Sequence, residues 1–456
     1  MITDRVGGGE VAVVGLGRSG RAAATLLARQ GARVYASDDG AKGDIAEGVS
    51  ALRARGVDAE FGGHDVARIA KAALVVASPG IRPDAAALAA ARSEGVPIVS
   101  EVEVALDALP DAKVIAITGT NGKTTTTALV AHLLTSLGCD AAAAGNIGTP
   151  LAAFAIRDRP PLWFALEISS FQLRDTPGIA PLVGVLTNLA PDHLDRYASA
   201  DEYYADKALL FRNATAQSRW VSNADDARVV AMVRGVAGQH ARFSVETTKA
   251  DAWFDRDGER LMLMGEPLLD RGDLALLGDH NVANALAAAL AVAIADPVHQ
   301  TPLARQRLSA GLKTFRALPH RLEVVGEFGG VEWINDSKAT NVDSARVAIA
   351  GMARPTVLLL GGRHKGEPYT SLADSIRRHV KVVLAYGEAA PIVAKDLAGV
   401  VPIERLGSSF EQVIARARLL AKPGDAVLLS PACSSYDMFD NYEMRGAEFR
   451  RLAAAT

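Results

Sequence analysis

The sequence predicts an α/β protein with three domains built around parallel β-sheets. Short apolar runs, many of them rich in Val and Ile, alternate with longer helical stretches, which is the pattern of repeated βαβ units. Glycine-containing loops follow three of these runs, at the strand ends where α/β proteins bind ligands. The length of 456 residues allows about three domains of roughly 150 residues each.

The predicted domains follow one another along the chain. The first covers residues 1–112 and has strands at 11–14, 34–37, 74–77 and 98–100. The second covers residues 113–317 and has strands at 113–117, 163–166 and 183–186, a helix that ends near residue 137, and a long helix at 281–295. The third covers residues 318–456 and has strands at 331–334, 357–360, 382–385 and 426–429.

Composition excludes several classes of protein. The 49 Lys and Arg nearly balance the 52 Asp and Glu, so nucleic acid is not expected as the main partner. Two cysteines, Cys139 and Cys433, give neither a disulfide framework nor a thiolate metal site. The N-terminus lacks the apolar core of a signal peptide, and the Ala-rich run at 281–295 is too short to span a bilayer. We therefore expect a cytoplasmic protein without a membrane partner. The chain is also expected to be a monomer.

The first glycine loop runs from Gly15 to Gly20, between a strand and a helix, with Asp38 at the end of the next strand. Glycines let the backbone approach a diphosphate, the helix N-terminus favours its charge, and the Asp can accept from a ribose or uracil group. Binding of nicotinamide or flavin, or a tight turn without a ligand, are alternatives for this pattern.

The second glycine loop, at residues 118–126, has the Gly-Lys-Thr core of a P-loop. Lys123 can reach terminal phosphoryl oxygens, and Thr124 can place its hydroxyl on Mg²⁺. Ile117 stands where the general P-loop pattern has its first glycine. A surface turn with a solvated lysine is the alternative.

Polar residues follow several further strands. Glu167 is placed to hold a metal ion beside the phosphates. His193 lies in a loop with Asp192 and Asp195, although such a histidine is more often structural. Residues 335–341 follow a third strand, and residues 361–366 form a third glycine loop that is as consistent with an exposed charged loop as with a site.

Five segments, in this order and over nearly the whole chain, resemble the Mur ligases, ATP-dependent amide-forming enzymes of peptidoglycan synthesis: residues 118–125, 166–172, 188–195, 278–284 and 318–321. Two more, 333–341 and 429–446, look like those of the members that add D-glutamate. The resemblance implies an N-terminal Rossmann-like domain for UDP, a central P-loop ATPase domain, and a C-terminal Rossmann-like domain for the amino acid.

The resemblance also implies the reaction and its partners. D-Glutamate would be ligated to UDP-N-acetylmuramoyl-L-alanine through an acyl phosphate made with ATP and two Mg²⁺ ions. Another amino-acid-adding Mur ligase and a folylpolyglutamate synthase are alternatives of the same class. A nicotinamide-dependent oxidoreductase and a non-catalytic nucleotide-binding protein are alternatives of different classes.

The resemblance also implies roles for individual residues within the matching motifs. The sugar nucleotide would be bound by Gly17, Arg18, Ser19, Asp38, Ser78, Gly80, Asn146 and Gln172. ATP would be bound by Gly119, Thr120, Asn121, Gly122, Lys123, Thr124, Thr125, Asn281, Asn284, His320, Arg321 and Asp336. D-Glutamate would be bound by Lys338, Thr340, Lys365, Ser435 and Tyr442. The metal ligands would be Thr124, Glu167, His193 and Lys207, and the catalytic residues Lys123, His193 and Lys207.

Lys207 illustrates how the resemblance changes an interpretation. On pattern alone it is a solvated lysine on an amphipathic helix. The resemblance implies instead that CO₂ carbamylates it and that the carboxylate helps to bind the second Mg²⁺. One departure from the family occurs at Arg363-His364, where some relatives have an acidic residue before the lysine, so the partners of Lys365 stay open.

Overall fold

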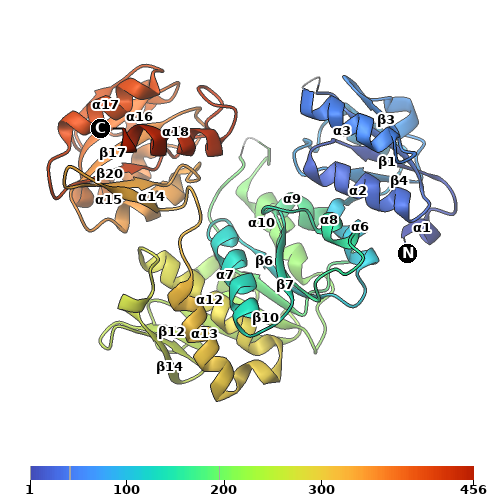
Figure 1. Ribbon diagram of the computed structural model, residues 1–456, viewed down its shortest axis with the longest axis horizontal. Coiled ribbons are helices and arrows are strands. Elements are labelled where there is room, and N and C mark those ends of the chain that lie inside the picture. The colour runs from blue at the N-terminus through green and yellow to red at the C-terminus, as the bar shows by residue number, and fades with distance from the viewer. Residues whose placement is uncertain (1, 41–42, 195, 456) are drawn as a thin grey trace. The chain divides into compact units, whose positions relative to one another are not determined.

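The computed structural model describes residues 2–40, 43–194 and 196–455. These residues form three sheets (Figure 1) and divide into two compact units. The first unit is built from the described residues of Met1–Leu189, Ser199–Arg271 and Asn284–Lys313, and the second from those of Ala190–Ala198, Gly272–Ala283 and Thr314–Thr456. The first unit therefore contains two sheets, and the second contains one.

The N-terminal sheet has five parallel strands in the order β3-β2-β1-β4-β5. They are β1 (Glu10–Val14), β2 (Arg33–Asp38), β3 (Asp58–Phe61), β4 (Leu74–Ala77) and β5 (Ile98–Ser100). The helices around them are α1 (Ile2–Arg5), α2 (Arg18–Arg29), α3 (Gly43–Arg53), α4 (Val66–Ile69), α5 (Ala86–Ser93) and α6 (Glu101–Ala108). This strand order is that of nucleotide-binding sheets, in which the ligand lies beyond the carboxyl end of β1.

The central sheet has nine strands in the order β14-β13-β12-β11-β10-β9-β6-β8-β7. They are β6 (Lys113–Thr118), β7 (Ala141–Gly145), β8 (Trp163–Glu167), β9 (Val183–Leu186), β10 (Arg219–Asn223), β11 (Gln239–Ser244), β12 (Ala252–Asp255), β13 (Arg260–Leu263) and β14 (Glu266–Asp270). Only the β12-β13-β14 edge is antiparallel among the strands of this sheet that the structure describes.

Helices accompany the central strands in the order expected of βαβ units. They are α7 (Lys123–Ser136), α8 (Leu151–Ala155), α9 (Ser170–Arg174), α10 (Ala200–Ala208), α11 (Ala227–Met232), α12 (Asp279–Ala295) and α13 (Pro302–Thr314), with short 3₁₀ turns η1 (Leu209–Phe211), η2 (Arg271–Asp273) and η3 (Pro297–Gln300). No helix in the described ranges has both the length and the apolar character needed to cross a bilayer.

The second unit is built on a six-stranded sheet in the order β15-β16-β20-β17-β18-β19, in which only β15 is antiparallel among the strands described. Its strands are β15 (Glu323–Phe328), β16 (Val331–Asn335), β17 (Thr356–Gly361), β18 (Val380–Tyr386), β19 (Ile403–Arg405) and β20 (Ala426–Leu429). Its helices are α14 (Val342–Ala350), α15 (Ala373–His379), α16 (Ala390–Asp396), α17 (Phe410–Leu420) and α18 (Tyr442–Ala454), with the 3₁₀ turn η4 (Tyr369–Leu372).

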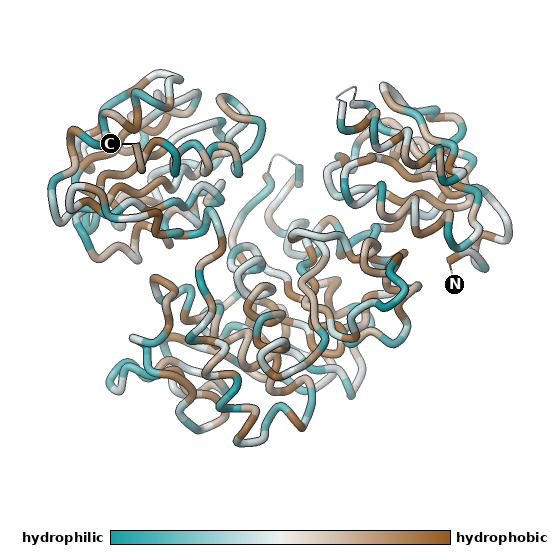
Figure 2. The backbone as a smooth tube through the Cα atoms, in the orientation of Figure 1, coloured by the Kyte–Doolittle hydropathy of each residue, from teal (hydrophilic) through white to brown (hydrophobic). Residues whose placement is uncertain are grey.

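The cores of the sheets follow from their apolar strands. β4, β9, β17 and β20 are buried along their whole length, as expected for parallel strands covered on both faces. Figure 2 shows brown, apolar segments in the interior of each part of the chain and teal, polar segments mainly at its surface. The predicted α/β class and its apolar strands are therefore confirmed. Strands β3, β7, β10 to β15 and β19 were not predicted.

Candidate active site

The first glycine loop is closed by its own backbone and by Asp38. The Asp38 carboxylate accepts from the amide nitrogens of Leu16, at 2.6 Å, and Gly40, at 2.7 Å. A Cβ at Gly20 would lie 1.8 Å from the carbonyl oxygen of Gly15, so helix α2 can begin this close to β1 only with glycine there. Asp38 thus shapes the loop in addition to its predicted role toward a nucleotide.

The other predicted residues of this loop lie beside it. The hydroxyl of Ser78, after β4, donates to the carbonyl oxygen of Gly15 at 2.7 Å. Gly17, Arg18 and Gly80 are exposed and Ser19 is half-buried. Exposed backbone and a cationic side chain at a helix N-terminus suit the binding of a diphosphate.

Gly119 and Gly122 of the P-loop lie so close to neighbouring residues that a side chain at either position would clash. Gly119 has φ +144° and Gly122 has φ +80°. A Cβ at Gly119 would lie 2.0 Å from the Thr187 hydroxyl, and one at Gly122 would lie 2.3 Å from the side-chain oxygen of Asn284. The loop therefore packs tightly between the residues after β9 and helix α12, which brings Asn284 to the start of α7.

The residues after β9 hold the P-loop in shape. The side-chain oxygen of Asn188 accepts from the amide of Asn121 at 2.9 Å, and its amide group donates to the Asn121 carbonyl at 3.0 Å. Thr187 donates to the same carbonyl at 2.6 Å. Sequence reasoning did not assign either residue a role, although Asn188 followed a predicted strand.

Lys123 and Lys207 converge on the P-loop backbone. Lys123 Nζ donates to the carbonyl oxygens of Gly119, at 2.9 Å, and Thr120, at 2.7 Å. Lys207 Nζ donates to the Gly119 carbonyl at 2.7 Å and lies 4.5 Å from the centre of the Tyr203 ring. Lys207 is 1% exposed, so the interpretation of a solvated lysine is wrong.

Glu167 ends β8 beside the P-loop. It pairs in register with Ile117, the residue before the loop begins at Thr118. Its Oε1 accepts from the Asn146 amide group at 2.8 Å, whereas its buried Oε2 has no hydrogen-bond partner among the residues described. A buried carboxylate oxygen without a partner is costly unless a cation compensates it.

The arrangement around Glu167 fits a magnesium ion. Mg²⁺ takes one or two carboxylates and completes its shell with hydroxyls, waters and phosphate oxygens, and Thr124 at the start of α7 offers a hydroxyl. The described residues contain no group of three or more His, Cys, Asp or Glu that could hold a metal. A metal at Glu167 would therefore need oxygen ligands of these other kinds.

Gln172 has a structural role beside Glu167. Its side-chain oxygen accepts from the backbone amide of Ser169 at 3.0 Å, and the Ser169 hydroxyl caps α9 in return, which is a capping box. Its Nε2 is buried and has no partner in the described part of the chain. This amide group is a donor available to a ligand oxygen.

Thr125, on α7, is buried in the first unit, whereas His193, Asn281 and the predicted residues from His320 onward belong to the second unit. His193 has φ +56°, its amide donates to the Asp192 carboxylate at 2.8 Å, and its side chain is 38% exposed. Asn281 donates to the Leu277 carbonyl at 2.8 Å. Asp195, which shares the His193 loop, lies outside the described residues.

His320 and Asp336 are both buried in the second unit. The His320 Nδ1 lies 3.0 Å from the Asn335 amide nitrogen, and burial lowers the pKa of its imidazole. Asp336 accepts from Ser430 at 2.9 Å and from the Leu322 amide at 3.2 Å. Burial raises the pKa of Asp336 to about 7. Arg321 lies between His320 and Leu322 on the turn before β15.

The residues predicted for D-glutamate come from three loops of the same sheet. Lys338 and Thr340 follow β16, Lys365 follows β17, and Ser435 and Tyr442 follow β20. The Lys338 Nζ lies 3.7 Å from the centre of the Tyr442 ring, so the first and third of these loops meet. Strands β16, β20 and β17 are neighbours, which places the three loops at one edge of the sheet.

The unusual Arg363-His364 pair has its own partners. Arg363 forms an ion pair with Glu388 at 3.1 Å, and His364 Nδ1 lies 3.0 Å from the Tyr369 hydroxyl. Both side chains therefore bond to residues outside the predicted pocket, and the positive charge that Lys365 presents is not offset by an acidic neighbour at 363 or 364.

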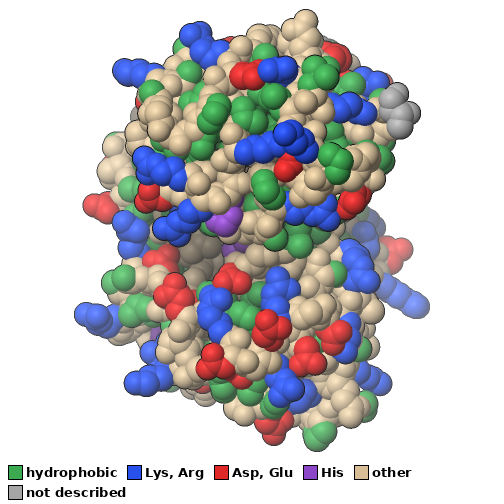
Figure 3. Space-filling model, turned by 90° about the vertical axis from the view of Figure 1, so that its left-hand side faces the viewer, with side chains coloured by type: hydrophobic (Ala, Val, Ile, Leu, Met, Phe, Trp, Pro, Cys, Tyr) green, Lys and Arg blue, Asp and Glu red, His purple; other side chains and the backbone are tan. Residues whose placement is uncertain are grey.

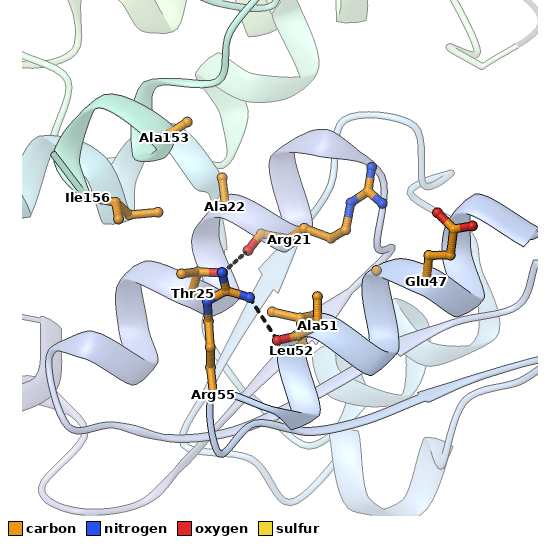
Figure 4. Close-up of a pocket in the computed structure, with 10 residues that line it drawn as sticks. Arg21, Ala22, Thr25, Glu47, Ala51, Leu52, Arg55, Ala153 and Ile156 are labelled. Atoms are coloured by element: carbon orange, nitrogen blue, oxygen red, sulfur yellow. Dashed lines mark hydrogen bonds between the residues drawn. The ribbon is translucent and has the colours of Figure 1, made fainter.

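A cavity of about 440 Å³ lies elsewhere in the first unit, between α2, α3 and α8 (Figure 4). Apolar side chains of Ala, Leu and Ile line it together with Arg21, Thr25, Glu47 and Arg55, and the hydrogen bonds drawn there, from Thr25 and Arg55, go to backbone carbonyls. None of the predicted site residues lines it. Figure 3 shows basic and acidic side chains interspersed over the face that it presents.

Three family descriptions match successive parts of the chain. Residues 9–100 match the Mur ligase MurD-like N-terminal domain, residues 117–292 the Mur ligase middle domain, and residues 320–433 the Mur ligase glutamate ligase domain. A UDP-N-acetylmuramoylalanine–D-glutamate ligase from Acidobacterium capsulatum is 39% identical over 98% of this chain and 96% of its own. The chain belongs to the Mur ligase family.

Other relatives agree with this assignment. The proteins of the same name from Chromobacterium violaceum and Myxococcus xanthus are 42% and 40% identical, over 98% and 100% of this Mur ligase and 97% and 100% of their own lengths. The solved UDP-N-acetylmuramate–alanine ligase of Thermotoga maritima covers 98% of the chain and all of its own, with a TM-score of 0.61 at 20% identity. This likeness supports the fold of the Mur ligase, and the predicted family is confirmed.

Proposed function

We propose that this Mur ligase joins D-glutamate to UDP-N-acetylmuramoyl-L-alanine, with ATP cleaved to ADP and phosphate, in peptidoglycan biosynthesis. The observation that carries the proposal is identity of about 40% over nearly the full length to ligases named for this reaction. The resemblance of segments 333–341 and 429–446 to the D-glutamate-adding members supports the choice of amino acid.

In the first step, the carboxylate of the L-alanyl group attacks the γ-phosphorus of ATP and forms an acyl phosphate. The backbone amides of the P-loop would bind the phosphates at the N-terminus of α7. Lys123 would leave its two backbone acceptors and donate to the phosphoryl oxygens, where charge accumulates. Asn284, packed against Gly122, would contact the nucleotide side of the loop.

Mg²⁺ would supply Lewis-acid stabilisation of the transferring phosphoryl group. Glu167 and Thr124 would hold one ion, and His193 and carbamylated Lys207 would hold a second. The partnerless Oε2 of Glu167 supports the first position. Asn146 fixes the other oxygen of this carboxylate, so Glu167 would present Oε2 in one orientation.

In the second step, the amine of D-glutamate attacks the acyl carbon and displaces phosphate through a tetrahedral intermediate. Two carboxylates must be bound for this amino acid, which calls for cations and hydroxyl donors. Lys338, Lys365, Thr340 and Ser435 would supply these at the edge formed by β16, β20 and β17. His320 and Arg321, on the turn before β15, and Asp336, which directly follows β16, would contact the nucleotide.

Carbamylation of Lys207 forms part of the proposal. The neutral amine would attack CO₂, form an N–C bond and release a proton to solvent, and a carboxylate would result. The carbamate keeps one N–H, so the hydrogen bond to the Gly119 carbonyl could persist while the new oxygens face the metal. Burial of Lys207 beside the P-loop supports a role there over a role in solvent contact.

The proposal extends to a monomer of about 47.7 kDa that works in the cytoplasm. Neither Cys139 nor Cys433 is in a disulfide in the described structure, which agrees with a reducing compartment. Light scattering of the purified chain measures the mass, and a dimer mass would contradict this part.

Release of ADP and phosphate, measured over a panel of amino acids, tests the function. We expect turnover only with UDP-N-acetylmuramoyl-L-alanine and D-glutamate together. Turnover with L-alanine, L-lysine or diaminopimelate in place of D-glutamate would indicate another Mur ligase. Hydride transfer with a nicotinamide cofactor, or ATP binding without turnover, would favour the alternatives of other classes.

A further inference from the structure

A buried hydrogen bond joins two loops that are far apart in the sequence. The side-chain amide of Asn341 donates to Oδ2 of Asp192 at 3.1 Å, across 149 residues of chain. Both residues are 6% exposed and both belong to the second unit. A hydrogen bond from a neutral amide to a buried carboxylate is stronger than one between neutral groups.

Asp192 also shapes the residue that follows it. Its Oδ1 accepts from the backbone amide of His193 at 2.8 Å, and its Oδ2 lies 3.7 Å from the His193 Nε2. His193 has φ +56°, a left-handed conformation that costs a non-glycine residue free energy and needs support from its surroundings. The Asp192 carboxylate provides this support to both the backbone and the ring of His193.

Asn341 has a second bond that fixes its orientation. Its side-chain oxygen accepts from the Ser344 amide at 2.8 Å and so caps helix α14. Lys338 and Thr340 lie on the turn immediately before it. The Asn341 amide group can therefore point only toward Asp192 while the cap is kept.

The other end of α14 contacts a second segment from the middle of the chain. A Cβ built on Gly351, the C-cap residue, would lie 3.5 Å from the Cα of Gly278. Gly278 belongs to Gly272–Ala283, which is grouped with the C-terminal sheet just as Ala190–Ala198 is. Helix α14 is thus bound at its two ends to the segments that carry His193 and Asn281.

We infer that Asp192 and Asn341 are positioning residues that tie the His193 loop to the amino-acid-binding turn at Lys338 and Thr340. The roles of His193, Lys338 and Thr340 in this inference rest on the proposed function. The pair makes the place of His193 depend on the place of this turn, so that His193 and the predicted residues for D-glutamate keep one arrangement within the second unit.

Exchange of the two side chains tests the inference. In Asp192→Asn, two amide groups face each other, and in Asn341→Asp, two carboxylates do. In Asp192→Asn one oxygen replaces the two that accept from the His193 amide and from Asn341, so one of these two bonds is lost, and in Asn341→Asp the donor is lost and the carboxylate pair adds repulsion. In the double variant Asp192→Asn/Asn341→Asp, the amide side chain at position 192 keeps an oxygen for the His193 backbone and donates to the carboxylate at position 341. That carboxylate caps α14 as well as the amide side chain of the parent does.

Hydrogen–deuterium exchange of peptides covering 190–198 is the first readout, since it needs neither substrate nor metal. We expect faster exchange in both single variants and exchange near that of the parent in the double variant. Asp65→Asn, which changes the exposed N-cap of α4 in the N-terminal sheet, is the matched control and should leave this peptide unchanged.

Steady-state kinetics is the second readout. Each single variant should lower kcat by roughly tenfold or more, with little change in KM for the sugar nucleotide, and the double variant should recover most of the loss. The inference would be overturned if the loss of kcat in the double variant equalled the two single losses combined. It would also be overturned if hydrogen–deuterium exchange at 190–198 were unchanged in the single variants. Absence of ligase activity in the parent would instead contradict the proposed function, while the exchange result would still decide the pairing.

Discussion

Lys123 and Lys207 donate to one carbonyl oxygen, that of Gly119 in the P-loop, at 2.9 and 2.7 Å. Lys123 starts the helix after the loop, whereas Lys207 lies near the end of α10, 84 positions further along the chain. Two cations therefore meet at the loop that should bind the phosphates of ATP. Their roles can be separated by substitution, because Lys123 would contact phosphate directly and Lys207 would act through a carbamate.

Replacement of Lys123 by Ala should lower ATP turnover by roughly a thousandfold, because a charge that stabilises the transition state is lost. The fold should persist, since the side chain is only half-buried and bonds to carbonyls of the loop itself. ADP release and circular dichroism measure the two effects. The control is Lys71→Ala, at an exposed position in the N-terminal sheet region. Near-normal turnover in a folded Lys123 variant would remove it from the phosphate site.

Replacement of Lys207 by Ala should lower kcat roughly a hundredfold and leave affinity for the sugar nucleotide nearly unchanged. Added acetate or formate should restore part of the activity by supplying a carboxylate near the vacated position. Acetate should give no gain with Lys123→Ala, which serves as the control. Mass spectrometry under bicarbonate, or a crystal grown with Mg²⁺ and bicarbonate, shows the modification directly, and an unmodified Lys207 there would contradict carbamylation.

Replacement of Glu167 by Gln should raise the Mg²⁺ concentration needed for half-maximal activity by roughly tenfold or more. Gln keeps an oxygen for the Asn146 amide group but loses the anionic oxygen that faces the metal. A Mg²⁺ titration of phosphate release measures the change. The control is Glu94→Gln, at the exposed C-cap of α5, which should need the same Mg²⁺ concentration as the parent. An unchanged Mg²⁺ requirement in Glu167→Gln would mean that Glu167 does not bind the metal.

Much of the fold could be read from the sequence because buried parallel strands are nearly continuous runs of Val, Ile and Leu. Strand β7 was not predicted, because its sequence Ala-Ala-Ala-Ala-Gly has helical propensity and no β-branched residue. It becomes a strand by pairing with β8 along its whole length. A Cβ on Gly145 would lie 2.2 Å from the Glu167 carbonyl oxygen, a constraint that only the folded chain reveals.

The candidate site was predictable where it depends on local pattern and not where it depends on distant contacts. The P-loop could be found because its glycines and Lys123 are adjacent in sequence. The burial of Lys207 could not be predicted, because it results from packing against Tyr203 and the loop at Gly119. The bond between Asp192 and Asn341 spans 149 residues, and no local pattern predicts it.

Replacement of Lys365 by Ala should raise the KM for D-glutamate by roughly tenfold or more, with smaller changes for ATP and the sugar nucleotide. The reason is that a cation at the end of β17 would pair with one of the two carboxylates of D-glutamate. Initial rates with each substrate varied in turn give the three constants. Lys395→Ala, on the exposed face of α16 in the same unit, is the control, and a larger effect on ATP than on D-glutamate would move Lys365 out of the pocket.

Because Glu101 is buried, the free energy of unfolding should fall as its carboxyl group loses its proton. It begins α6, is 1% exposed, and accepts from the Ala152 amide with one oxygen, while the other has no partner in the described structure. Burial raises the pKa of Glu101 from 4.5 to about 7. The folded protein therefore holds this proton more tightly than the unfolded chain does, and its stability falls as pH rises from about 4.5 through about 7.

Glu101→Gln should remove this pH dependence, because Gln keeps an acceptor for the Ala152 amide and does not ionise. The free energy of unfolding of the variant relative to the parent should therefore rise between pH 4.5 and about pH 7, by up to about 3 kcal/mol, and then level off. Urea unfolding at a series of pH values measures it. Glu47→Gln, at an exposed position on α3, should show no such rise, and a flat difference for Glu101→Gln would mean that the carboxyl is ionised in the folded protein throughout this range.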